Sequence, residues 1–201
     1  MVGGTGDFGL ALAQRLVEAG EEVVIGSRDA ERAREKAAGV GARGAENVEA
    51  VHGVELVVLA VNADAALPTA ESLADAIAET PVLSVASELR FTKQGVYPTA
   101  ATLSIAERTR DLLHAPVAAG LHSLAAASLG QRKPDGDVLV CGDDAAAKEL
   151  ALQLAATVVT GRALDAGPLA SARALEGMTA VIVNLNKRYR GHAGLRVVGL
   201  P

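Results

Sequence analysis

Three glycines near the start of the chain, Gly4, Gly6 and Gly9, have the spacing G-x-G-x-x-G. With this spacing the first glycine turns a strand into a helix, the second lets the backbone approach a pyrophosphate, and the third brings helix and strand close together. The context fits, because residues 7–19 have the periodicity of an amphipathic helix and the apolar run 23–25 follows. The predicted dinucleotide site consists of Gly4, Thr5, Gly6, Asp7, Phe8 and Gly9. The alternative is a plain turn without a ligand.

The end of the second strand indicates which dinucleotide binds. Sites for NAD usually carry an acidic residue about 20 positions after the first glycine, where it binds the ribose 2′-hydroxyl. Here Ser27 and Arg28 stand at that place, and Arg32 follows one helical turn later. A hydroxyl and two guanidinium groups suit a 2′-phosphate, so the sequence favours NADP(H) over NAD. The alternative is that both arginines belong to the solvated start of a helix.

The composition excludes several classes of protein. The chain has 201 residues, half of them apolar, and its net charge of −5 argues against a nucleic-acid-binding surface. A single cysteine excludes a disulfide framework, and the four histidines lack ligand-like spacing, so no metal is expected. Neither an apolar run of membrane length nor a secretory leader is present, which predicts a cytoplasmic protein with no membrane partner.

Strand and helix patterns alternate along the chain behind these motifs. Strands are expected at 56–61, 82–86, 117–121, 138–141 and 162–165, and helices at 29–38, 65–79, 104–113 and 145–156. Only Met1 and Val2 precede the glycine loop, so either the first strand is truncated or it is a short stub. Residues 87–103 are expected to form a long loop over one edge of the sheet. The alternation predicts an α/β fold, a doubly wound Rossmann-type parallel sheet with a small, mainly helical C-terminal domain. We expect an NADP-binding domain at 1–166 and the helical domain at 167–201.

In such sheets ligands collect at the carboxyl ends of the strands, near the point where the strand order reverses. This rule selects residues 84–87 and two further segments, which consist of Val61, Asn62, Ala63, His122, Ser123 and Leu124. His122 is the candidate catalytic residue, because a neutral imidazole beside a nicotinamide could donate a hydrogen bond or help to orient the ring. The alternative is a histidine that bonds to a strand-end carbonyl and has no role with a ligand.

Two groups of charged residues have both a functional and a structural interpretation. Asp143 and Asp144 follow a strand and could form an acid–base pair, but we favour helix N-cap residues that bind free amides. A basic cluster near the C-terminus could attract an anionic ligand tail, or its cations could be placed by the dipole of the last helix. The cluster consists of Lys187, Arg188, Arg190 and Arg196.

Taken together, these segments resemble the NADPH-dependent reductases of coenzyme F420, a deazaflavin. The resemblance is carried, in the family's order, by GGTGDFG (3–9), VVIGSR (23–28), LVVLAV (56–61), LHSLAAA (121–127), VCGDD (140–144) and LDAGPLASARALE (164–176). It implies that the glycine loop holds the pyrophosphate and that Ser27, Arg28 and Arg32 hold the 2′-phosphate. The segments at Val61 and 122–124 would line the nicotinamide and the deazaflavin, and the C-terminal domain would help to form the deazaflavin cleft.

The resemblance implies an NADP-dependent oxidoreductase that passes a hydride between NADP(H) and coenzyme F420. Direct transfer between two stacked rings requires positioning more than acid–base groups. Its partners would be these two small molecules, and a homodimer is a compatible assembly. Two departures from the family lie near the second cofactor, since Asn62 and Ala125 stand where relatives have proline. The alternatives are an NADPH-dependent reductase of another flavin, a ferric complex or a small imine, and an NADP-binding sensor without chemistry.

Overall fold

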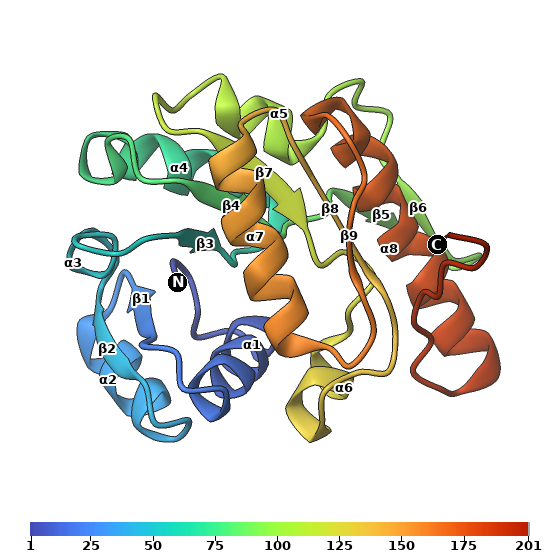
Figure 1. The fold of residues 1–201 in the computed structure, drawn as a ribbon, viewed down its shortest axis with the longest axis horizontal. Helices are drawn as coiled ribbons and strands as arrows, with labels where there is room; N and C mark the ends of the chain where they lie inside the picture. The colour runs from blue at the N-terminus through green and yellow to red at the C-terminus, as the bar shows by residue number, and fades with distance from the viewer. Residues whose placement is uncertain (201) are drawn as a thin grey trace.

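A computed structural model describes residues 1–200, and in it helices and strands alternate along most of the chain (Figure 1). The helices are α1 (Asp7–Glu18), α2 (Ala30–Ala38), α3 (Asn47–Ala50), α4 (Ala63–Ile77), α5 (Ile105–Arg110), α6 (Ala126–Gln131), α7 (Ala145–Val158), the 3-10 turn η1 (Leu169–Ser171) and α8 (Ala172–Tyr189). The strands are β1 (Val24–Ser27), β2 (Arg43–Glu46), β3 (Val57–Leu59), β4 (Val82–Ser84), β5 (Leu89–Phe91), β6 (Val96–Pro98), β7 (Val117–Gly120), β8 (Val138–Gly142) and β9 (Ala163–Asp165). No helix within residues 1–200 is both long enough and apolar enough to cross a membrane.

Met1 and Val2 form a short central strand, here called the stub. Val2 donates to the Val58 carbonyl at 2.9 Å, and on the other side Gly26 donates to the Met1 carbonyl at 2.7 Å. This stub therefore joins the pair β1-β2 to the sheet β3-β4-β7-β8-β9. The strand order becomes β2-β1-stub-β3-β4-β7-β8-β9, and it reverses at the stub, directly below the glycine loop.

Strands β3, β4, β7 and β8 contribute side chains to two separate cores. In β3, Val57 and Leu59 belong to the core under α4 and α5, while Val58 belongs to the core under α1 and α7. This alternation follows from the pleat, which sends successive side chains to opposite faces. Helices consequently cover both faces of the sheet (Figure 1). The predicted doubly wound α/β fold is confirmed.

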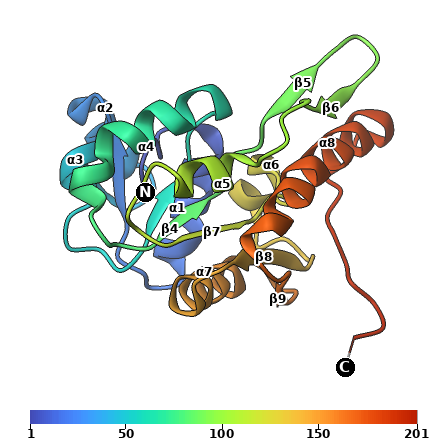
Figure 2. The same cartoon turned by 90° about the horizontal axis from the view of Figure 1, so that it is seen from above.

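The expected loop at 87–103 is wrong, because most of it forms the antiparallel hairpin β5-β6. The hairpin projects from the sheet and runs beside α8 (Figure 2). Its pairing depends on α8, where the Asn184 side chain accepts from the Val96 amide at 2.8 Å and donates to the Val96 carbonyl at 2.7 Å. The sequence did not predict this hairpin because its strands have only three residues each and Phe91 is largely exposed. Such short strands show no alternation of apolar and polar residues.

Two other details differ from the expected sheet. β8 runs antiparallel to β7, so the sheet is mostly and not wholly parallel. The short helix α6, which was not among the expected elements, lies between them in the chain and packs against α1.

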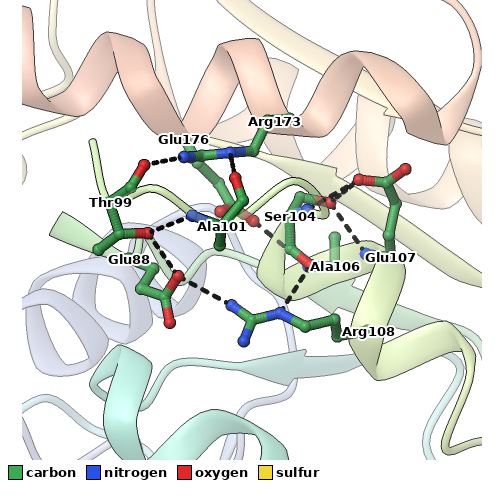
Figure 3. Close-up of polar contacts among 9 residues, drawn as sticks. All are labelled: Glu88, Thr99, Ala101, Ser104, Ala106, Glu107, Arg108, Arg173 and Glu176. Atoms are coloured by element: carbon green, nitrogen blue, oxygen red, sulfur yellow. Dashed lines mark hydrogen bonds and ion pairs between the residues drawn. The ribbon is translucent and has the colours of Figure 1, made fainter.

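α8 is held to the rest of the chain by buried and partly buried polar contacts (Figure 3). Arg173 donates to the carbonyls of Thr99 and Ala101 at 2.6 and 2.9 Å, and Glu176 accepts from the Ala106 amide at 3.3 Å. After α8 the chain turns back and pairs Leu195 with Asp137 at the start of β8. The division into domains at residues 166 and 167 stays a prediction.

Candidate functional site

The glycine loop crosses from the central stub into α1, and its positions require glycine for different structural reasons. Gly4 donates to the Gly26 carbonyl at 3.2 Å. A Cβ on Gly9 would lie 2.7 Å from the Cα of Gly4, so this position requires the close approach of helix and strand. Around Gly6, by contrast, a Cβ would meet nothing within 4 Å. Packing within the protein therefore explains Gly9, whereas the open space at Gly6 fits the approach of a ligand to the backbone.

The helix behind this open space presents uncapped amides. Gly6 is the N-cap of α1, and no side chain caps the amides of the first turn. Free amides together with the positive end of the helix dipole form an anion-binding site. Thr5 is half-buried and Asp7 is exposed at this turn, while Phe8 packs against the core around α1. The residues present thus fit the pyrophosphate of a dinucleotide.

The carboxyl end of β3 lies directly beside the glycine loop. A Cβ on Gly3 would fall 2.0 Å from Cγ1 of Val61, so these two residues are in contact across the switch in strand order. Asn62 is the N-cap of α4, although its side chain makes no capping bond, and Ala63 begins the helix. The structure therefore brings Val61, Asn62 and Ala63 next to the predicted pyrophosphate site.

Asn47 supports the same loop, and the sequence reading missed it. Its side-chain oxygen accepts from the Gly3 amide at 3.4 Å and would lie 2.8 Å from a Cβ on Gly26. Asn47 is buried at the first position of α3, directly after β2. A polar residue between a strand and a helix is a weak signal, because most such residues serve only as caps.

Ser27, Arg28 and Arg32 lie together at the carboxyl end of β1 and the start of α2. The Ser27 hydroxyl accepts from the Asp29 amide at 3.2 Å, and Asp29 caps α2 by accepting from the Arg32 amide at 3.1 Å. Both arginine side chains are exposed, and within residues 1–200 neither guanidinium has a carboxylate within ion-pair distance. Two cations without an internal partner fit a phosphate brought by a ligand.

His122 follows β7 and is buried, with 5% of its surface exposed. Neither ring nitrogen has a hydrogen-bond partner, although the Ala86 backbone lies close enough to favour the charged form. Burial outweighs that contribution and lowers the pKa of His122 to about 4, so the ring is neutral at neutral pH. The preceding residue, Leu121, has a φ of 68°, a left-handed conformation that is costly for leucine. A strained turn that presents an unpartnered buried imidazole fits a ligand-binding segment.

Hydroxyl groups connect this segment to α8 and to the end of β4. Thr179 donates to the His122 carbonyl at 2.9 Å, and its hydroxyl lies 2.8 Å from that of Ser87. The Ser84 hydroxyl, at the end of β4, is buried without a partner. The sequence reading selected the segment 84–87 but missed Thr179, which on sequence alone is one polar residue within a helix.

Beyond His122, the chain lines a cavity of about 200 Å³. Ser123, Leu124 and residues 192–195 of the C-terminal segment line it, together with residues of α6 and of the segment that leads into β8. β4 separates β7 from β3 in the sheet, so the segment 122–124 lies two strands away from Val61. The predicted site residues thus form two groups along one edge of the sheet.

The remaining charged candidates have structural partners. Asp144 is the N-cap of α7 and accepts from the Ala147 amide at 2.8 Å, as the structural interpretation predicts, and Asp143 accepts from the Leu169 amide at 2.9 Å. The basic cluster is divided, since Arg196 pairs with Asp135 at 2.8 Å, away from the three cations at the end of α8. Among the described residues, no group of three acidic, histidine or cysteine side chains could hold a metal ion.

Known proteins are similar to this chain in sequence. A family profile described as "NADP oxidoreductase coenzyme F420-dependent" matches residues 1–88. The F420-dependent NADP reductase of Methanothermobacter thermautotrophicus is 35% identical over 219 residues, which cover 100% of this chain and 94% of the relative. This chain belongs to the family of F420-dependent NADP reductases. A second member, from Methanocaldococcus jannaschii, is 31% identical over 100% of this chain and 97% of its own length.

Family membership confirms the resemblance that the glycine loop and the later segments predict. The crystal structure of a putative F420-dependent NADP reductase from Arthrobacter sp. FB24 has the same fold, with a TM-score of 0.81 over 97% of this chain and 96% of that chain. Because the two are 24% identical, this likeness supports the fold alone. The roles of individual residues in the family's reaction remain to be assigned from the site itself.

Proposed function

We propose that this enzyme transfers a hydride between NADP(H) and coenzyme F420. The relatives that match the whole chain are named for this reaction. The observation that carries the proposal on the NADP side is the uncapped start of α1 behind Gly6, with the free guanidinium groups of Arg28 and Arg32 at the next strand end. These features fit a pyrophosphate and a 2′-phosphate.

The glycine loop and the neighbouring strand ends bind different parts of NADP(H). The amides at Gly6, Asp7 and Phe8 hold the pyrophosphate, and the lack of a side chain at Gly6 lets it approach. Ser27, Arg28 and Arg32 hold the 2′-phosphate. With this end of the cofactor fixed, Val61, Asn62 and Ala63 at the carboxyl end of β3 would line its nicotinamide.

The segment at 122–124 orients the reacting rings. When bound, the nicotinamide and the deazaflavin supply the two carbon atoms between which the hydride moves. His122 contributes a neutral imidazole in a dry environment, and its place is fixed by the bond from Thr179 to its carbonyl. Ser123 and Leu124 line the cavity beside it. Because hydride transfer needs aligned rings more than a proton relay, this part of the chain acts through geometry.

Three finer statements belong to the same proposal. The enzyme acts in the cytoplasm, it assembles as a homodimer, and residues 167–201 form a small domain that completes the deazaflavin cleft. Sedimentation analysis tests the dimer, and the Arthrobacter sp. protein offers a structural reference for the domain boundary. The activity assay distinguishes this function from the alternatives. These are reduction of another flavin, a ferric complex or a small imine, and a sensor without chemistry.

The deciding assay follows the absorbance of oxidised F420 with NADPH or NADH as the donor. We expect turnover with NADPH and an affinity for NADPH at least about tenfold tighter than for NADH, which corresponds to roughly 1.4 kcal/mol. Arg28→Asp should erase or invert this preference, because a carboxylate repels the 2′-phosphate. Arg34→Asp is the matched control, since Arg34 is an exposed arginine of α2, the helix that follows Arg28.

Each failure has a separate meaning in this assay. Equal affinities for both nucleotides in the unmodified protein would refute the NADP assignment. Tight NADPH binding without a change in F420 absorbance would refute the F420 reaction and favour one of the other acceptors or the sensor.

A further inference from the structure

The C-terminal segment after α8 returns to the sheet as a strap, here defined as residues 192–197. Near its start the Ala193 amide donates to the side-chain oxygen of Asn186 in α8. Farther along, the Leu195 carbonyl accepts from the Asp137 amide at 2.7 Å, and the Val197 amide donates to the Asp137 carboxylate at 2.8 Å. The strap is therefore fastened to α8 near one end and to the region around the start of β8 at the other, where Arg196 also pairs with Asp135 at 2.8 Å and Arg162 also donates to the Val197 carbonyl.

Asp137 holds the strap at the start of β8, and both of its carboxylate oxygens accept hydrogen bonds. One oxygen accepts from the Arg162 amide at 2.9 Å, and the other accepts from the Arg162 guanidinium at 3.0 Å and from Val197. Asp137 is buried, with 4% of its surface exposed. The Arg162 side chain, helped by the two amides, holds the pKa of Asp137 well below its usual range. A buried carboxylate is costly unless it is paired and hydrogen-bonded, and here every bond leads to the strap or to Arg162.

The same residue also touches the predicted cofactor segment. The Ser123 hydroxyl donates to the Asp137 carbonyl at 3.4 Å, in the buried turn that follows β7. Asp137 thus connects the segment 122–124 on one side to the strap on the other. Both segments line the cavity of about 200 Å³, and Asp137 itself is among the lining residues. A cavity of this size is smaller than a typical ligand pocket, so it suits one part of a larger molecule.

We infer that Asp137 is a positioning residue that fastens the strap as the outer wall of the F420 site. The inference rests on the proposed function, because it assigns the cavity to part of the second cofactor. Asp137 does not touch the reacting atoms. It acts by fixing the separation between the strap and the segment 122–124, and hence the fit of F420 between them, while the NADP site at the glycine loop is left unchanged.

The sharpest test removes a single donor from the strap. Val197→Pro deletes the amide hydrogen that binds Asp137, because proline has no backbone N–H. Val198→Pro is the matched control, since Val198 is 83% exposed and its amide makes no hydrogen bond within the described residues. Asp137→Asn is the second variant, which removes the charge but keeps the shape. For each variant one measures kcat, the KM for F420, the KM for NADPH, and the melting temperature.

We expect Val197→Pro and Asp137→Asn to raise the KM for F420 about tenfold, the effect of losing one charge-assisted hydrogen bond. The KM for NADPH should stay unchanged, and Val198→Pro should behave like the unmodified enzyme. An unchanged KM for F420 in both test variants would overturn the inference. So would an equal rise in both KM values with a lower melting temperature, because that marks a purely structural residue. If the unmodified protein does not reduce F420 at all, the proposed function itself fails, which is a different result.

Discussion

Replacing Glu176 by glutamine should stabilise the protein at alkaline pH, and the effect should disappear in acid. Glu176 lies in α8 with no exposed surface, facing the start of α5 (Figure 3). One carboxylate oxygen accepts from the Ala106 amide at 3.3 Å, and the other has no partner. The nearby cations are engaged elsewhere, Arg173 with two backbone carbonyls and Arg108 with Glu88 at 3.0 Å. Ionised Glu176 is therefore poorly compensated.

The magnitude follows from the pKa of this carboxyl group. Burial, only partly opposed by the amides of Ala106 and Ile105 and by the two arginines, raises the pKa of Glu176 from 4.5 to about 7. Below about pH 4.5 the group is protonated in both the folded and the unfolded state. As pH rises through 7, the unfolded state has already ionised and the folded state bears the cost. The free energy of unfolding should therefore fall by about 3 kcal/mol between pH 4.5 and pH 8.

The measurement is urea unfolding and thermal unfolding of the unmodified protein and of Glu176→Gln at several pH values from 5 to 9. Glutamine cannot ionise, so the difference between the two proteins should grow with pH and reach roughly 6–12 °C in melting temperature above pH 8. Glu71→Gln, at an exposed position of α4, is the control and should show no such trend. A difference between Glu176→Gln and the unmodified protein that stays constant across this range would refute the reasoning.

Three further predictions concern the site. Gly9→Ala should lower the free energy of unfolding by about 1–3 kcal/mol in urea, because its Cβ would meet Gly4 at 2.7 Å, whereas Gly6→Ala should leave stability unchanged and weaken NADPH binding in a titration. His122→Asn should retain substantial turnover, whereas His122→Ala should lose about 10–100-fold in kcat, because small misplacements of the reacting groups are costly when catalysis depends on positioning. Inactivity of both variants, if they fold, would instead make His122 an essential acid–base residue. The cations at the end of α8 are Lys187, Arg188 and Arg190. Neutralising them should raise the KM for F420 and reduce the salt dependence of this KM, while the KM for NADPH stays the same. If both KM values stay the same, these cations are only a solvated helix end.

The features that the sequence predicted correctly are those decided within a few residues. The helix expected from residue 104 forms as α5 and begins with a capping box, in which Ser104 accepts from the Glu107 amide at 3.0 Å and the Glu107 carboxylate accepts from the Ser104 amide at 2.8 Å. Asp144 caps α7 in the same local manner. The helix behind the glycine loop and the buried run of β3 also needed no distant partner, because amphipathic spacing and continuous apolarity are properties of one segment.

The features that the sequence could not predict depend on contacts between distant residues. The hairpin β5-β6 is paired to α8 through Val96 and Asn184, which are 88 residues apart. Thr179 reaches the His122 carbonyl across 57 positions, and Val197 reaches Asp137 across 60. Nothing in the local pattern of these polar residues distinguishes them from ordinary surface positions, because their partners are chosen only when the sheet and α8 have packed.

The amino-acid sequence by itself determined the kind of chemistry. The glycine spacing and the basic strand end are local recognition elements, so they indicated a nucleotide with a 2′-phosphate before any fold was known, and the later segments indicated the family. The tertiary structure decided what surrounds that chemistry. It showed that Gly6 faces open space, whereas the backbone of Gly4 occupies the space beside Gly9. It also showed that burial keeps His122 neutral and that Asp137 fastens the C-terminal strap. Burial, free space and long-range hydrogen bonds arise only when segments far apart in the chain are brought together, and these are the quantities that position two cofactors.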